Sequence, residues 1–207
     1  MSFNSASLGG VLASFEQTIP TLLKECTMSS NIAHWGGAIY AEKGSVVNIV
    51  LCLIVSNTAS YCGGAISVDN NATLLVTASM MSSNSVSWAG GAIYTSRASL
   101  VILSESDLFG NFAIGGGAVY AGTNGDGIDD ESCSTVLMYD VVLSLNIATM
   151  GGALYAAASS YVHSVGCAFT SNYAVQVGFF IPRNLSVPTK WSFSSYPTTE
   201  WWRSRTR

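Results

Sequence analysis

The chain has 207 residues, of which 49% are hydrophobic and only 10% are charged, against about 25% charged residues in ordinary soluble domains. Residues 1–182 carry three cations against eleven carboxylates, a formal charge of −8, whereas five of the eight cations follow residue 182. This negative body disfavours a nucleic acid as the partner. No apolar run approaches the roughly 18 residues that a membrane-spanning helix needs, so we expect no membrane span in this chain.

A pair of glycines followed by alanine and a hydrophobic residue recurs along the chain. The first glycines of successive pairs stand 27, 27, 26 and 35 residues apart. A fixed period of this kind identifies a repeat architecture before any local pattern is considered. We expect the glycines to let the backbone bend without a Cβ clash. The pairs are Gly36 and Gly37, Gly63 and Gly64, Gly90 and Gly91, Gly116 and Gly117, and Gly151 and Gly152.

An asparagine stands five or six residues before each glycine pair, with a hydrophobic residue three positions before the asparagine. Asparagine tolerates the left-handed backbone conformation, and its side-chain amide can bond an identical amide one repeat away. We therefore expect a structural ladder at the corner of each repeat rather than a set of catalytic groups. Its members are Asn31, Asn57, Asn84, Asn111, Asn146 and Asn172, preceded by Asn4.

The period of 27 is too short for a pair of helices, and it suits a β-helical solenoid. Short β-rich runs separated by small polar residues lie between the glycine pairs. We expect three strands in each coil and a single all-β domain over residues 1–181, a parallel β-helix with six to seven coils of about 27 residues. The expected strands outside the glycine motifs cover residues 45–50, 52–55, 72–77, 98–103, 135–139 and 160–164.

Stacked coils would place equivalent residues in columns about 4.8 Å apart. The column through Ile39, Ile66 and Ile93 never admits a polar residue, so it is predicted to point into the core. The next position, because strand side chains alternate, is predicted to point outward. It forms a tyrosine stripe that could stack on sugar rings or anchor a protein partner, or could simply protect the sheet by ring stacking. The stripe consists of Tyr40, Tyr94, Tyr120 and Tyr155, interrupted by Ser67.

The coil between Gly116 and Gly151 is longer than the others, and its surplus is an acidic loop at residues 121–132. Carboxylates are missing from two of the positions that a calcium loop requires, so a solvated loop is favoured over a calcium site. Residues 182–207, rich in proline, tryptophan and arginine, are expected to form an irregular tail. The chain opens on a repeat without the features of a signal peptide. We therefore expect it to be part of a longer polypeptide.

Three of the five cysteines, Cys26, Cys52 and Cys167, share one column with serine and valine, and this column is predicted to point inward. They are interpreted as small buried hydrophobic residues. Cys26 and Cys52 would also lie at a Cα spacing compatible with a disulfide, so the redox compartment stays open. No cysteine pair has metal-ligand spacing, and we expect neither a metal nor a cofactor.

One carboxylate pair could carry chemistry. Glu42 and Asp69 both stand six residues after a first glycine, with Lys43 and Arg97 next to the equivalent positions. A retaining glycosidase uses two carboxylates about 5–5.5 Å apart. The favoured interpretation is nevertheless a solvated turn whose opposite charges offset one another, because ion pairs are usually not functional sites.

Two histidines, His34 and His163, occupy positions that are not equivalent, and the pattern places no nucleophile beside either. A catalytic triad is therefore not predicted.

The motif hydrophobe-x-x-Asn-x-Ala followed by Gly-Gly-Ala-Ile resembles the repeat of the polymorphic outer membrane protein family. Residues Phe169, Thr170, Ser171 and Asn172 give a full FxxN match. The resemblance implies a right-handed parallel β-helix, exposed at a cell surface or secreted, that often serves as an adhesin. We therefore predict a non-enzymatic adhesion or stalk module that binds a glycan or a surface protein. The alternative is a carbohydrate-active β-helix enzyme that uses Glu42 and Asp69.

Overall fold

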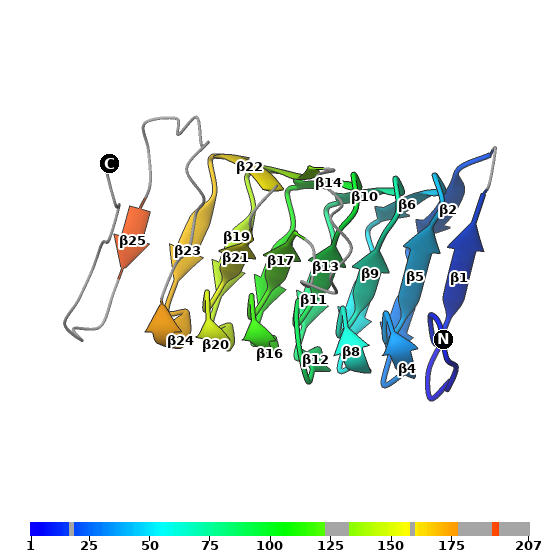
Figure 1. The fold of residues 1–207 in the computed structure, drawn as a ribbon, viewed down its shortest axis with the longest axis horizontal. Helices are drawn as coiled ribbons and strands as arrows, with labels where there is room; N and C mark the ends of the chain where they lie inside the picture. Colours follow the sequence, from blue (N-terminus) through cyan, green and yellow to red (C-terminus); the bar gives the residue numbers. More distant parts are fainter. Residues whose placement is uncertain (17–18, 123–132, 158–159, 178–191, 195–207) are drawn as a thin grey trace.

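The structure is a computed structural model that describes residues 1–16, 19–122, 133–157, 160–177 and 192–194. The described residues form a parallel β-solenoid of stacked coils, with the N-terminal coil at the right of Figure 1 and the last strands at the left. Every strand pair is parallel and joins one coil to the next, as the period predicted. The acidic loop lies largely outside the described residues, as does most of the expected tail.

Four parallel sheets run along the solenoid, and we number them in the order in which the first complete coil visits them. The first sheet contains β1 (Leu12–Phe15), β5 (Ile39–Glu42), β9 (Ile66–Val68), β13 (Ile93–Thr95), β17 (Val119–Ala121) and β21 (Leu154–Ala156). The second sheet contains β2 (Thr21–Lys24), β6 (Val46–Val50), β10 (Thr73–Thr77), β14 (Leu100–Ser104), β18 (Ser134–Tyr139) and β22 (Ser160–Val165).

The third and fourth sheets complete each coil. The third sheet contains β3 (Thr27–Ser29), β7 (Leu53–Val55), β11 (Met80–Ser82), β15 (Asp107–Phe109), β19 (Val142–Ser144), β23 (Ala168–Thr170) and β25 (Ser192–Ser194). The fourth sheet contains β4 (Ile32–Trp35), β8 (Thr58–Cys62), β12 (Ser85–Val86), β16 (Phe112–Gly115), β20 (Ile147–Met150) and β24 (Tyr173–Val177).

Each full coil thus contains four strands, and the prediction of three was wrong. The asparagine was placed at a corner and no strand was predicted after it, but the segment after each asparagine pairs in register with its neighbours and forms the fourth sheet. In addition, Ser192–Ser194 of the expected tail pair with β23, so this short part of the tail adds a strand to the third sheet.

The predicted internal column is present. Ile39, Ile66 and Ile93 are each fully buried and pair with one another in register. Inward residues of the first three sheets join them in one continuous core along the solenoid. Ala59, Val86 and Ala113 of the fourth sheet form a separate small cluster.

The two glycines of each pair have different structural roles. Each first glycine has a positive φ, +59° at Gly36 and +71° at Gly90, a region that residues with a Cβ seldom adopt. The second glycines are needed for close approach. A Cβ on Gly64 would lie 2.1 Å from the backbone oxygen of Gly91 in the next coil. The two glycines therefore let the backbone turn sharply between the fourth and first sheets while the coils stay at sheet spacing.

Candidate functional site

The tyrosine column lies on the side of the first sheet that faces away from the main core. Tyr94 pairs in register with Tyr120, which pairs with Tyr155. The rings of Tyr94 and Tyr120 stack with centroids 5.5 Å apart, and those of Tyr120 and Tyr155 with centroids 5.2 Å apart. The side chains form a hydrophobic cluster distinct from the core. The alternation of strand side chains therefore predicted their direction correctly.

The prediction that this stripe is exposed was wrong for Tyr40, Tyr94 and Tyr120, and Tyr155 is half-buried. Tyr40, Tyr94 and Tyr120 are only 6%, 2% and 8% exposed. The turn at the glycine pairs folds the fourth sheet back against this side of the first sheet, so the rings lie in a concave corner. Small residues opposite them leave the space, and a Cβ on Gly115 would stand 3.2 Å from the Tyr120 ring.

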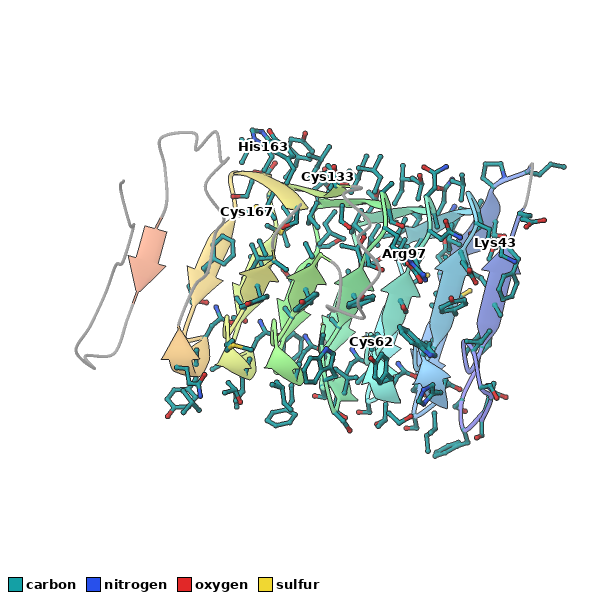
Figure 2. All side chains as sticks on the ribbon, viewed as in Figure 1. Lys43, Cys62, Arg97, Cys133, His163 and Cys167 are labelled. Carbon is teal, nitrogen blue, oxygen red and sulfur yellow. The ribbon has the colours of Figure 1, made fainter. Side chains whose placement is uncertain are left out.

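The same corner explains the interruption at Ser67. Ser67 is fully buried although it contributes no ring. Trp35 of β4 lies beside this gap, with its ring centroid 6.3 Å from that of Tyr94, two coils further along. It also contacts Tyr61, with centroids 4.6 Å apart. Trp35, a large residue of the fourth sheet, thus compensates for Ser67, a small residue of the first sheet. Figure 2 labels Cys62 at this corner.

Ring stacking along the column has a direct consequence for ligand binding. Successive tyrosines cover one another's faces, and the fourth sheet covers their edges. A sugar ring that stacks on an aromatic side chain needs an accessible ring face. The stacked and covered rings of the tyrosine column therefore favour a structural role at the corner over a role in binding sugars.

Tyr61 and Trp88 stand at a bulge of the fourth sheet beside this corner, and His34 lies in the neighbouring coil. His34 and Trp88 are exposed, and Tyr61 is half-buried. The fourth-sheet strands of the coils that contain Tyr61 and Trp88 each have one extra residue before the turn into the first sheet. The strand of the coil that contains His34 lacks this residue. Such bulges redirect side chains and occur often at functional sites. We call His34, Tyr61 and Trp88 the bulge aromatic row.

Within this row, the rings of His34 and Tyr61 stack with centroids 5.6 Å apart and an angle of 23°. His34 Nδ1 lies 2.7 Å from the Ser60 hydroxyl, a hydrogen bond that orients the imidazole. Trp88 is 43% exposed and His34 is also exposed. The sequence held a signal for this row that our interpretation missed. The distance from asparagine to glycine is six residues in these two coils rather than five, and an aromatic residue occupies the added length.

The carboxylates of the predicted pair have separate partners. Asp69 is 1% exposed and forms an ion pair with Arg97 of the next coil, which also donates from Nε at 2.6 Å. The Ser96 hydroxyl and the backbone N–H of Asn70 donate to the same carboxylate at 2.7 and 2.8 Å. Opposite charges do offset one another here, but Asp69 is buried, and the prediction of a solvated turn was wrong for it.

Glu42 has a different role from Asp69. Its carboxylate accepts a hydrogen bond of 3.0 Å from the Tyr40 hydroxyl. Burial of the ring, followed by this hydrogen bond and the Glu42 charge, raises the pKa of Tyr40 far above its ordinary range. Lys43 pairs with Glu16 at 3.8 Å. Each carboxylate thus has its own partner within the turn, and Figure 2 shows Arg97 and Lys43 along this edge of the first sheet.

The asparagine column forms a continuous ladder of hydrogen bonds. The Nδ2 group of Asn57 donates to Oδ1 of Asn84 at 3.0 Å, and the backbone N–H of Asn57 donates to the same oxygen at 2.9 Å. This arrangement repeats from Asn4 to Asn172. The left-handed conformation expected of asparagine belongs instead to the residue before it, such as Ser56 and Ser83.

The cysteine column lies at the corner between the second and third sheets, and its thiols are free. The backbone N–H of Cys26 donates to Cys52 Sγ at 3.3 Å, and that of Cys52 donates to the Ser79 hydroxyl at 3.0 Å. The thiols thus replace hydroxyls in a polar ladder, rather than packing only as hydrophobic groups. Burial raises the pKa of Cys52 and of Cys167, which favours the protonated thiol at neutral pH.

The described residues contain no group of three histidine, cysteine or acidic side chains arranged to hold a metal ion. Among those residues, no helix has the length and apolar character to cross a membrane.

Comparison with known proteins identifies the repeat. Residues 25–42, which span one asparagine corner and the glycine turn after it, match the family model of the Chlamydia polymorphic membrane protein repeat. Residues 25–42 are thus similar to one polymorphic membrane protein repeat. No curated protein and no solved structure matches the chain. The repeat and the solenoid together indicate a structural repeat module of a surface protein.

Proposed function

We propose that this chain is a non-enzymatic β-helical stalk of a cell-surface or secreted protein, and that its bulge aromatic row is an adhesive surface for glycans. The observation that carries the stalk is the unbroken asparagine ladder, which couples every described coil to the next. A solenoid of this kind gains stability mainly from contacts between neighbouring repeats. It can therefore hold an elongated shape without a globular core.

The adhesive part of the proposal rests on the accessible rings of His34 and Trp88. Aromatic faces bind the apolar faces of sugars, and a nearby hydrogen-bonding group fixes orientation. The pairing of His34 with Ser60 supplies such a group. The fourth sheet also holds these rings on a rigid backbone, which limits the entropy lost on binding.

The test is a glycan array probed with the purified chain and with single variants. We expect Trp88→Ala and His34→Ala to lose the glycan signal, because each removes an exposed ring from the row. Phe112→Ala is the matched control, since Phe112 is an exposed aromatic residue of the same sheet outside the bulge, and it should bind as the parent chain does. Absence of glycan binding by the parent chain would refute the adhesive part and leave the stalk.

A carbohydrate-active enzyme that uses Glu42 and Asp69 is the competing function. The three hydrogen bonds and the ion pair that Asp69 receives favour a structural role for it. We expect no turnover of acidic or neutral polysaccharides by the parent chain. Turnover that the double variant Glu42→Gln, Asp69→Asn abolishes would refute the non-enzymatic proposal.

A further inference from the structure

Cys26 and Cys52 lie one above the other at the corner between the second and third sheets. On both sides of this corner the strands pair in register, β2 with β6 and β3 with β7, and two residues separate the strands in each coil. The two cysteines therefore occupy equivalent positions of adjacent coils. Their column continues through Ser79, Ser106 and Val141 to Cys167, which Figure 2 labels.

The two thiols have the same orientation. Cys26 Sγ lies 3.2 Å from the carbonyl oxygen of Lys24, and Cys52 Sγ lies 3.3 Å from that of Val50, in each case two residues earlier in the chain. Because the side chain is repeated from one coil to the next, the two sulfur atoms are separated by about the coil spacing, about 4.8 Å. A disulfide holds its sulfur atoms about 2 Å apart, so the thiols in this orientation are not arranged to form one.

The same separation suits a metal ion between the two sulfur atoms. A thiolate–metal bond is about 2.3 Å long, so a linear S–metal–S unit needs sulfur atoms about 4.6 Å apart. Cu(I) and Ag(I) are soft cations that favour thiolate ligands and accept two of them in a line. Zn²⁺ takes four ligands in structural sites. The described part of the chain offers no group of three histidine, cysteine or acidic side chains for such an ion.

One backbone group already donates a hydrogen bond to a sulfur atom of this pair. The N–H of Cys26 lies 3.3 Å from Cys52 Sγ. In the next coil the Ser79 hydroxyl accepts the equivalent bond from the N–H of Cys52 at 3.0 Å. A donor of this kind stabilises the negative charge that a sulfur atom carries once it has lost its proton. The pair therefore has part of the outer hydrogen-bonding shell that metal ligands use.

A groove of about 390 Å³ lies along the same corner, and its lining includes both cysteines. Cys26 is half-buried and Cys52 is 4% exposed. Three carboxylates also line the groove, and their negative charge raises the local concentration of cations. Lys24 offsets only one of these charges, by pairing with Glu25 at 3.4 Å. The three carboxylates belong to Glu25, Glu105 and Asp107.

We propose that Cys26 and Cys52 bind one soft monovalent cation, Cu(I) or Ag(I), in a linear S–metal–S unit that joins two adjacent coils. Binding breaks two S–H bonds and forms two metal–sulfur bonds, and the two protons pass to the solvent. No electrons are transferred, so the step needs neither an oxidant nor a reductant. The site is separate from the bulge aromatic row of the fourth sheet, and it does not depend on the adhesive proposal.

Titration of the folded chain with Ag(I) in a chloride-free buffer tests the site, because Ag(I) keeps its oxidation state in air. Every variant carries Cys133→Ser, which removes the exposed thiol. We expect native mass spectrometry to show one ion per chain, and X-ray absorption to show two sulfur neighbours. The thermal midpoint should rise with the Ag(I) concentration, since the ion binds only the folded arrangement of the two thiols. Zn²⁺ should bind far more weakly.

Cys26→Ser and Cys52→Ser should each weaken Ag(I) binding by more than about 100-fold, because loss of a ligand costs more than loss of an outer-shell partner. Serine already occupies this column at Ser79 and Ser106, so both variants should fold, which far-UV circular dichroism checks. Cys167→Ser is the matched control. Cys167 belongs to the same column but has no cysteine in the coil before it, so this variant should bind as the parent chain does.

A rescue variant tests whether stacking alone makes the site. Cys26→Ser combined with Ser79→Cys moves the thiol pair one coil along, with Cys52 as the shared member, and it should restore Ag(I) binding. Absence of binding by the Cys133→Ser chain, or binding that persists after Cys26→Ser or Cys52→Ser, would overturn the proposal. A folded rescue variant that does not bind Ag(I), or an ion with more than two protein ligands, would overturn the linear two-coil geometry on which it rests.

Discussion

Replacing Asn84 by alanine tests whether the asparagine ladder holds the coils together. The Asn84 side chain donates to the Ile54 carbonyl at 3.0 Å and to Asn111 Oδ1 at 3.1 Å. It also accepts from the backbone N–H and Nδ2 of Asn57 at 2.9 and 3.0 Å. All four bonds are buried, and a net contribution of about 1 kcal/mol each gives a loss of about 4 kcal/mol in the free energy of unfolding. This is a large share of the roughly 5–15 kcal/mol that typically stabilises a domain.

The measurement is urea unfolding followed by far-UV circular dichroism, from which the free energy is extrapolated. Asn4→Ala is the matched control, because Asn4 is exposed and its side chain makes one ladder bond, to Asn31 at 2.8 Å. We expect this control to lose at most about 1 kcal/mol. Equal losses for the two variants would refute the conclusion that the buried ladder is a principal source of stability.

Three further outcomes follow from the corners. Gly64→Ala should destabilise the solenoid far more than Gly110→Ala, because only the former places a Cβ against backbone of the next coil, and similar thermal midpoints would contradict this. Ellman's reagent should modify the exposed Cys133 rapidly and Cys52 only on unfolding, since Cys52 is buried and its pKa is raised; rapid labelling of both would disprove the burial. Because the pKa of Tyr40 is raised by folding, its contribution to stability is complete below about pH 10 and is lost above that pH, as the unfolded state ionises first. The variant Tyr40→Phe should therefore lose less stability at alkaline pH than the parent chain does, as followed by phenolate absorbance.

Much of the solenoid could be predicted from local chemistry repeated at a fixed spacing. The isoleucine column, the glycine turns and the amide ladder depend only on equivalent residues lying above one another, which the period dictates. Five of the six strands of the second sheet were placed within one or two residues for the same reason, since their apolar runs are long, whereas β2 was not predicted. The fourth sheet was missed because β12 has only two residues, Ser85 and Val86, and such a segment is held by pairing rather than by propensity.

The functional surface was less predictable than the fold. The alternation of strand side chains predicted that the tyrosines point away from the core. It could not predict that the fourth sheet folds back over them. The accessible rings belong instead to His34 and Trp88. Trp88 lies in a coil whose fourth-sheet strand has an added residue that changes the local register. Glu42 and Asp69 stand at equivalent positions of adjacent coils, but each has a different partner, and the ion pair that Asp69 forms depends on where Arg97 of the next coil reaches.

The amino-acid sequence by itself determined the coil length and the residues of the core and corner columns, because a side chain that recurs once per coil meets its own copies. Only the tertiary structure decided which outward side chains are covered. Two sheets meet at an angle in each coil, and a concave corner buries an outward ring while a flat face leaves it in water. That difference in shape separates the buried tyrosine column from the open outer face of the second sheet.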